Sequence, residues 1–171
     1  MMMGLFAVKS VSVVIYSGLL FAVSGMIFPM KFAIAVNFCG AAIMVTLPWL
    51  IGKKGGGTMV SSIMKKYPKT EKLKEICTGN GFILTFLLRV IGKIPSDVLS
   101  LYLGAIGIDY KVYFAGSMLG LLPHLFTFPI MGMNIQNIHS TEFRISVGIE
   151  AIYMAGSAGL YWIYSKKRKR K

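Results

Sequence analysis

Four ionisable residues lie inside or beside apolar segments of this chain: Arg89, Asp97, His124 and Glu150. A charged side chain at the centre of a bilayer costs about 2.5–3.5 kcal/mol on insertion scales, so residues of this kind are rare there and usually functional. Arg89 precedes the short break at residues 92–97 and Asp97 ends it, so the two could pair across the turn. A guanidinium can also hold a phosphate group through two parallel hydrogen bonds. The two interpretations are compatible.

His124 and Glu150 are candidates for a proton relay, because histidine titrates near neutral pH and burial favours the neutral form of a carboxyl group. The structural alternative for His124 is a packed ring bonded to a backbone carbonyl. Glu150 could instead pair with Arg89 or with an interfacial group. The sequence has no Walker loop, HExxH, GxSxG or dinucleotide fingerprint, and no metal-ligand spacing. We therefore expect no catalytic residues, no enzyme activity, no metal and no cofactor.

The composition is that of a membrane protein. Of the 171 residues, 55% are hydrophobic and 15% are charged, and the mean hydropathy is +0.66. Soluble domains carry about 25% charged residues. A soluble domain of this length could not bury so much apolar surface, since surface-to-volume scaling limits its core.

The charge distribution indicates lipid headgroups as partners and excludes nucleic acid. The net charge is +13, and none of the six acidic residues precedes Glu71. Lysine and arginine cluster at residues 53–54, 65–74 and 166–171, where they flank apolar segments. A nucleic-acid-binding protein would instead place its basic residues along an exposed groove or helix face. Flanking clusters fit anionic phospholipids and the excess of positive charge on cytoplasmic loops.

Three segments are long enough to span a bilayer. Residues 32–51 are 20 residues without a charge and end at a flexible basic turn, residues 52–57. At about 1.5 Å per residue, such a helix crosses the roughly 30 Å hydrocarbon core. Residues 112–133 and 145–164 are predicted to cross as well. The remaining apolar run, residues 11–28, could be a spanning helix, a bent hairpin or a signal peptide.

Small residues mark a helix-packing face on the segment 112–133. Gly116 and Gly120 form a small-xxx-small pair that lets another helix approach closely, and Pro123 follows on the same segment. The basic segment 58–76 is predicted either to lie on the headgroups as a broken amphipathic helix or to be a solvated connector.

The stretch between residues 82 and 108 predicts a re-entrant hairpin. Its two apolar arms, 82–88 and 98–108, are each about ten residues or roughly 15 Å of helix, which is half a bilayer. The alternative is one kinked spanning helix. We predict an all-α integral membrane protein with spanning helices and one or two re-entrant helical hairpins, as a single membrane domain at residues 1–165. A basic tail, residues 166–171, follows on the cytoplasmic side.

A motif in the second half resembles a known family. It consists of an arginine, a Pro-x-Asp turn, a small-residue helix and a Gly-x3-Gly-x2-Pro segment, carried by Phe86 to Arg89, Pro95 to Asp97, Ser100, Gly104, Tyr113, Phe114, Gly116, Gly120 and Pro123. With weaker similarity at Gly18 to Phe21, Gly40 and Ile51 to Lys54, the chain resembles the DedA-like superfamily over residues 11–164. This superfamily is also called the SNARE-associated Golgi protein or VTT-domain family.

The resemblance implies two re-entrant hairpins that meet from opposite leaflets, and a lipid transporter of the scramblase or flippase type. It implies a transport path at Arg89, Pro95, Asp97, Ser100 and Gly104. The expected partners are phospholipids or polyprenyl-phosphate lipids, with anionic headgroups at the basic tail. The expected location is the plasma membrane in a prokaryote and an endomembrane such as the Golgi in a eukaryote.

Two other functions are compatible with the sequence. A membrane organiser or adaptor would use the small-residue faces and the basic tail to bind partners, which include a second copy of the chain in a homo-oligomer. A proton-coupled transporter of small solutes would use Glu150 as its coupling group.

Overall fold

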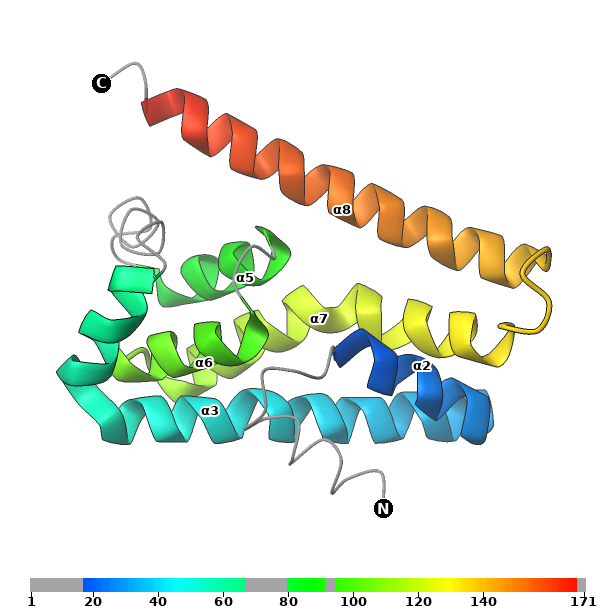
Figure 1. The fold of residues 1–171 in the computed structure, drawn as a ribbon, viewed down its shortest axis with the longest axis horizontal. Helices are drawn as coiled ribbons and strands as arrows, with labels where there is room; N and C mark the ends of the chain where they lie inside the picture. The colour runs from blue at the N-terminus through cyan, green and yellow to red at the C-terminus, as the bar shows by residue number, and fades with distance from the viewer. Residues whose placement is uncertain (1–16, 67–79, 92–94, 169–171) are drawn as a thin grey trace.

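The computed structural model describes residues 17–66, 80–91 and 95–168, and for residues 57–66, 158 and 160–168 it describes the backbone alone. This part of the chain is helical and has no strand (Figure 1). It therefore confirms the all-α prediction. The helices are α2 (Ser17–Ile27), α3 (Met30–Lys66), α5 (Gly81–Ile91), α6 (Ser96–Ala105), α7 (Tyr110–Met133) and α8 (Thr141–Arg168).

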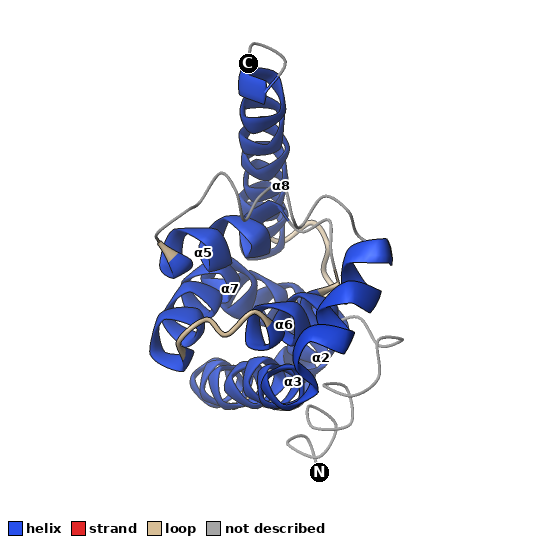
Figure 2. Ribbon diagram, turned by 90° about the vertical axis from the view of Figure 1, so that its left-hand side faces the viewer, coloured by secondary structure: helices blue, strands red, loops and turns tan. Residues whose placement is uncertain are grey.

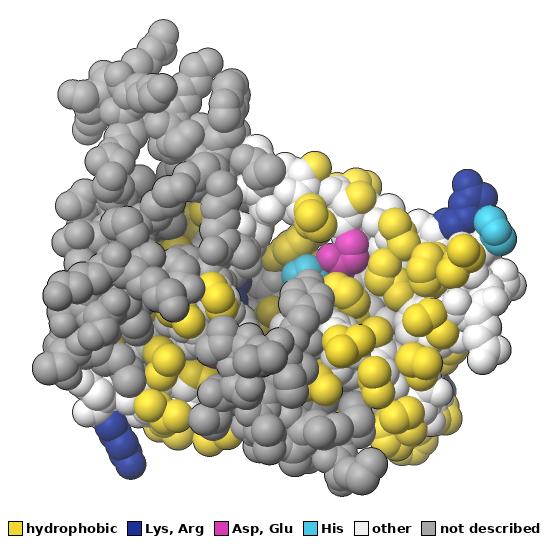
Figure 3. All heavy atoms as spheres, in the orientation of Figure 1, with side chains coloured by type: hydrophobic (Ala, Val, Ile, Leu, Met, Phe, Trp, Pro, Cys, Tyr) yellow, Lys and Arg dark blue, Asp and Glu magenta, His cyan; other side chains and the backbone are white. Residues whose placement is uncertain are grey.

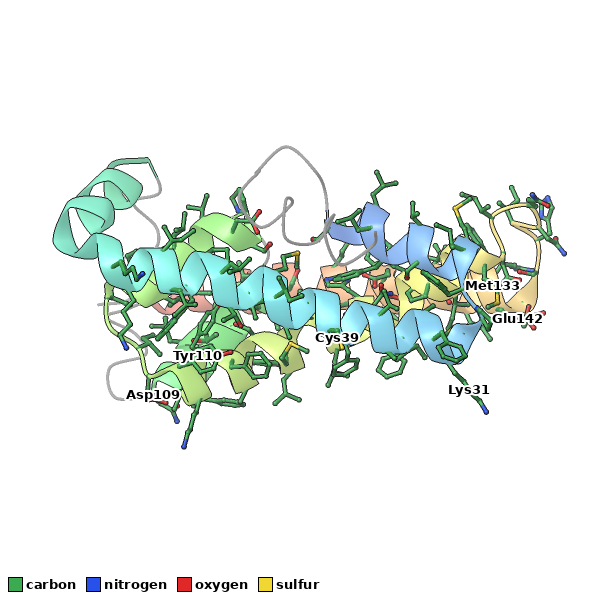
Figure 4. The ribbon with its side chains drawn as sticks, turned by 90° about the horizontal axis from the view of Figure 1, so that it is seen from below. Lys31, Cys39, Asp109, Tyr110, Met133 and Glu142 are labelled. Atoms are coloured by element: carbon green, nitrogen blue, oxygen red, sulfur yellow. The ribbon has the colours of Figure 1, made fainter. Side chains whose placement is uncertain are left out.

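Two of the described helices are long and apolar enough to cross a membrane, Met30–Gly56 of α3 and Tyr110–Met133, which is α7. They run in opposite directions, so that Lys31 near the start of α3 and Asp109 before α7 lie at opposite ends of the molecule (Figure 4). Large apolar side chains face outward on several helices, with Ile152 of α8 74% exposed. Such a surface is suited to lipid rather than to water.

The first span differs from the sequence prediction at its end. We predicted that the helix stops at Ile51 in a flexible turn, but α3 continues to Lys66 and bends at Gly56 (φ 53°, ψ −146°). Gly52 lies within this helix and packs against α6, where a Cβ would lie 2.0 Å from the carbonyl oxygen of Leu101. Gly56 then adopts a left-handed backbone conformation that other residues rarely tolerate.

Four glycines allow the short helices to contact the long ones backbone to backbone. Helix α2 packs against the second half of α7, and α6 packs against the second half of α3. At each crossing a Cβ would lie about 2 Å from a carbonyl oxygen, so a larger side chain would force the helices apart. The glycines and the residues whose carbonyls they face are Gly25 with Pro129, Gly132 with Ala22, Gly52 with Leu101, and Gly104 with Trp49.

These crossings reveal an internal repeat that the sequence analysis did not detect. Each unit is a short helix followed by a long one, α2 with α3 and α6 with α7. Gly52 and Gly132 each lie 22 positions after the first residue of their helix (30 to 52 and 110 to 132). Each short helix packs on the long helix of the other unit. Because α3 and α7 are antiparallel, the two units form an inverted repeat, an arrangement common in membrane transporters (Figure 1).

The chain folds back on itself between α5 and α6. A Cβ on Gly81, the first residue of α5, would lie 3.2 Å from Ile108 and 3.5 Å from Val112, so the outer ends of the two arms meet. One kinked helix over residues 82–108 would hold these ends far apart, and that alternative is therefore wrong. The turn itself, residues 92–94, lies outside the described residues.

Polar residues fix where the helices begin. The Asn80 side chain accepts hydrogen bonds from the backbone N–H groups of Phe82 and Ile83, at 3.1 and 3.3 Å. Asp109 caps α7 in the same way through Lys111 and Val112. Both side chains satisfy donors that a helix start leaves without partners.

The last helix stands apart from the others when the molecule is viewed along its long axis (Figure 2). Helix α8 contacts α7 and α5. Three of our predictions lie wholly or partly outside the described residues. They concern the form of the segment 11–28, the headgroup-bound form of 58–76, and the side chains of the basic tail.

Candidate functional site

Helix α5 brings Arg89 into the centre of the molecule. Most of its side chains from Leu84 to Ile91 are buried, so the helix lies with its apolar residues against the core. Gly116 and Gly120 of α7 make the contact close. A Cβ on Gly120 would lie 2.7 Å from the Arg89 Cβ atom. Helix α5 therefore packs on the predicted small-residue face of α7.

The Arg89 guanidinium makes four hydrogen bonds. Nε donates to Ser117 Oγ at 3.3 Å, Nη1 to the Ser96 carbonyl at 3.1 Å, and Nη2 to Ser100 Oγ at 2.7 Å and Tyr113 Oη at 2.9 Å. A guanidinium has five N–H donors. The residue is 7% exposed. The geometry therefore holds a positive charge in a fixed orientation inside the protein.

None of these four acceptors carries a charge. The predicted pairing of Arg89 with Asp97 is not observed, because no carboxylate oxygen of the described residues lies within 4.0 Å of the Arg89 nitrogens. Asp97 is buried, and one of its oxygens accepts a hydrogen bond from Ser96 Oγ at 3.5 Å. Among the described residues, no carboxylate is in direct contact with the buried Arg89 cation, and low-dielectric surroundings screen a buried charge poorly.

Tyr113 connects this arginine to the first spanning helix. Its hydroxyl accepts from Arg89 and donates to the Val45 carbonyl of α3 at 2.8 Å. The ring is fully buried and stacks on Trp49 at 6.0 Å between centroids. Our sequence analysis assigned no role to Tyr113 or Ser117. Their spacing could have identified them, because Tyr113, Ser117 and Gly120 occupy positions i, i+4 and i+7 and therefore share one helix face.

A second charged group joins α7 to α8. His124 Nδ1 lies 2.9 Å from Glu150 Oε1, and Thr127 Oγ also hydrogen-bonds to that oxygen. The predictions that His124 bonds to a carbonyl and that Glu150 pairs with Arg89 are not observed, because the two residues pair with each other. In Figure 3 an acidic side chain lies next to a histidine, and hydrophobic side chains prevail around them on the described part of this face.

Tyr153 lies next to this pair. Its ring makes an edge contact with the His124 ring at 5.0 Å between centroids. Its hydroxyl donates to the Gly120 carbonyl at 2.5 Å. Gly120 therefore contacts Arg89 on one side and Tyr153 on another. No group of three or more His, Cys, Asp or Glu side chains in the described ranges could hold a metal ion.

The other predicted site residues have separate places. Pro95 precedes the first turn of α6 and is half-buried. Gly104 lies at the α3 crossing against Trp49. Pro123 lies inside α7, where its carbonyl oxygen is 2.8 Å from Thr127 Oγ. Of the predicted transport residues, Ser100 contacts Arg89 directly, whereas Gly104 packs two helices together.

Comparison with known proteins places the chain in a family. The family model described as the VTT domain matches residues 14–134, a range that contains both glycine crossings and Arg89. The chain is also 23% identical over 136 residues to "Uncharacterized protein YqeD" of Bacillus subtilis (strain 168). That similarity covers 80% of this chain and 64% of YqeD, so the chain spans less than two thirds of this relative. No solved structure matches. The chain belongs to the VTT-domain family, also called the DedA family, whose members are transporter-like membrane proteins.

Proposed function

We propose that this protein moves phosphate-bearing lipids between the two leaflets of a membrane, and that Arg89 binds the headgroup phosphate on the way. One observation carries the proposal: the Arg89 guanidinium is buried and oriented, yet its four acceptors are neutral. A positive charge of this kind favours an anion at the same place. A phosphate fits the geometry of a guanidinium, because it accepts two parallel hydrogen bonds.

The hydroxyl groups around Arg89 suit a site that is occupied in turn by lipids. Ser100, Ser117 and Tyr113 supply neutral acceptors while no phosphate is bound. A hydroxyl group can also rotate and donate to a phosphate oxygen. Neutral partners give way to a charged ligand more easily than a carboxylate would, because hydrogen bonds between two charged groups are the stronger ones.

The proposed path enters the membrane at the hairpin of α5 and α6. These helices have 11 and 10 residues, or roughly 15 Å each, which is about half of the hydrocarbon thickness. The outer ends of the hairpin meet near Gly81 and Ile108, which supports entry and exit on one side. Irregular backbone is tolerated at this depth only where protein satisfies it. Next to the break, the Ser96 carbonyl at the start of α6 accepts hydrogen bonds from Arg89 and Ser100.

The inverted repeat supplies the complementary half of the path. Helix α2 packs against α7 in the same way as α6 packs against α3. The two long helices are antiparallel. Two short helices therefore approach the middle of the membrane from opposite leaflets in this proposal. A headgroup could cross between them while its acyl chains stay in lipid.

The test is reconstitution into liposomes that carry a fluorescent phospholipid in one leaflet. Wild-type protein should speed the equilibration of the label between leaflets. Arg89→Ala should lose most of this acceleration, at least about tenfold, since truncating a buried charge-assisted contact typically costs 2–5 kcal/mol. Arg89→Lys should keep part of it, because an ammonium keeps the charge but not the planar fork.

The matched control is Arg144→Ala. This arginine is exposed in the first turn of α8, so its loss changes the net charge equally without touching the site. Arg144→Ala vesicles should behave as wild type. Wild-type vesicles that equilibrate no faster than protein-free ones, or folded Arg89→Ala protein as active as wild type, would contradict the proposal.

A further inference from the structure

The pair of His124 and Glu150 lies outside the proposed headgroup site and has the chemistry of a proton-binding site. The side chains are 23% and 11% exposed, so they are mostly buried but still open to one face of the molecule. The histidine ring nitrogen and the carboxylate oxygen are 2.9 Å apart, the distance at which one proton is shared in a hydrogen bond.

One proton changes the net charge of this pair from −1 to zero. A neutral imidazole beside a carboxylate has one negative charge, whereas an imidazolium beside a carboxylate, or a neutral imidazole beside a carboxylic acid, has none. The two groups titrate as one unit, because they are in direct contact. The Thr127 hydroxyl bonds to Glu150 and has no charge of its own.

Arg89 is linked to this pair through Gly120 and Tyr153. Gly120 packs on the Arg89 Cβ atom and accepts a hydrogen bond from Tyr153, whose ring contacts His124. The Tyr153 hydroxyl is within electrostatic range of both Glu150 and Arg89. The titratable or charged groups of the described residues that face Glu150 are therefore His124 from α7, Tyr153 from α8 and, beyond Tyr153, Arg89 from α5.

We propose that His124 and Glu150 form a proton-binding site that is coupled to the binding of an anionic headgroup at Arg89. The inference rests on the proposed function. A phosphate at Arg89 places a negative charge near the pair, and this charge favours the form of the pair that has taken up a proton. Coupling between two sites is reciprocal. Protonation of the pair therefore strengthens headgroup binding, and its deprotonation weakens it.

The experiment measures binding of phosphatidylglycerol to the purified protein in detergent between about pH 5 and pH 8, the range where histidine charge changes. This lipid carries a phosphodiester, whose single charge does not change in that range. Wild-type affinity should be about tenfold higher at the acidic end, within the range typical of coupled sites. In weakly buffered solution, added lipid should also make the protein take up protons, which a pH indicator dye reports.

The decisive variant is Glu150→Gln, and Glu142→Gln is its matched control. The glutamine keeps hydrogen-bonding capacity but removes the carboxylate charge, so affinity near pH 8 should already match the value that wild type reaches at the acidic end. Because His124 alone can still take up a proton, the double variant with His124→Asn and Glu150→Gln should abolish the proton uptake caused by lipid. Glu142 is exposed in the first turn of the same helix, and its variant should keep the wild-type pH dependence. Should Glu150→Gln not fold, His124→Asn replaces the ring by a donor that takes up no proton and should weaken the dependence.

The outcomes separate this inference from the proposed function. Wild-type protein that binds phosphatidylglycerol equally at all pH values, or without proton uptake, overturns the coupling and leaves the headgroup site standing. Equal flattening by Glu142→Gln and Glu150→Gln also overturns it. Wild-type protein that binds no phosphatidylglycerol overturns both.

Discussion

At the scale of single residues, Tyr113 determines how Arg89 is held. Among the described hydrogen bonds of the four acceptors, that of Tyr113 to Val45 reaches α3, so Tyr113 ties the arginine of α5 to the long helix of the first repeat. Ser100 lies on α6 and Ser117 on α7, and these two helices form the second repeat. The orientation of the guanidinium therefore depends on how the two repeats are joined.

We predict that Tyr113→Phe destabilises the protein and weakens headgroup binding. The substitution removes two hydrogen bonds and leaves one Arg89 N–H group buried without a partner, which costs about 1–3 kcal/mol. Thermal unfolding in detergent and phosphatidylglycerol binding would measure the two effects. Tyr110→Phe is the control, since Tyr110 also bonds to α3, at Thr46, but at an exposed position. Equal effects of both substitutions would contradict the role assigned to Tyr113.

The ionisable residues could be chosen from the sequence, but their partners could not. Composition and apolar context were enough to single out Arg89, Asp97, His124 and Glu150. Proximity along the chain suggested that Arg89 pairs with Asp97, and the structure instead gives Arg89 hydroxyl and carbonyl partners. Residues 26 positions apart, His124 and Glu150, meet because α7 and α8 lie side by side. Periodicity gives the face of a helix and not the helix that will cover it.

At the scale of elements, the fold-back of α5 and α6 is the feature on which the proposed path depends. The apolar arms and the Pro/Gly break predicted it, because each arm is too short to span a membrane. The same data allowed a kinked helix. What decides between them is the contact of Gly81 with Ile108 and Val112, which no local pattern encodes.

We predict that cysteines at positions 81 and 112 form a disulfide. Oxidised protein that carries Gly81→Cys and Val112→Cys, with Cys39 and Cys77 replaced by serine, should yield the cross-linked peptides by mass spectrometry. A Cβ on Gly81 would lie 3.5 Å from Val112 Cγ1, so a cysteine sulfur in the place of that methyl group would be within reach of a sulfur on residue 81. In one continuous helix the two positions would be about 45 Å apart. Gly81→Cys with Met133→Cys, at the far end of α7, should not cross-link, and a cross-link only in this control would refute the hairpin.

At the scale of the whole molecule, the charge pattern predicts an orientation in the membrane. The basic segments 53–54 and 65–74 follow the apolar part of α3, and α8 runs back toward the same end (Figure 1). Lys31 and Glu142 lie at the opposite end (Figure 4). Because positive charge is preferred on the cytoplasmic side, we predict that the end with Lys111 and the basic tail is cytoplasmic.

We predict that single cysteines in place of exposed residues are labelled from opposite sides of sealed vesicles. In a background without Cys39 and Cys77, an impermeant maleimide should reach Lys111→Cys only from the cytoplasmic side. Lys31→Cys and Glu142→Cys should react only from the other side. Labelling of all three from one side would show that the described helices do not cross the membrane as assigned.

The repeat was the part of the architecture that sequence reasoning missed. Its two units share few residues apart from the glycines at the crossings, and those glycines are ordinary in membrane helices. These four glycines are distinguished by their contacts, because each one packs against a carbonyl of the opposite unit. Membrane residence, by contrast, followed from composition alone, because it depends on the total amount of apolar surface.

The reciprocal crossings also bear on biosynthesis. The ribosome synthesises α2 and α3 before α7. Helix α2 nevertheless packs against Gly132 of α7 in the folded protein. The small-residue surface of the first unit therefore stays exposed to lipid until the second unit has been inserted. Neither unit is complete without the other, so assembly of this fold is a single late event rather than two successive ones.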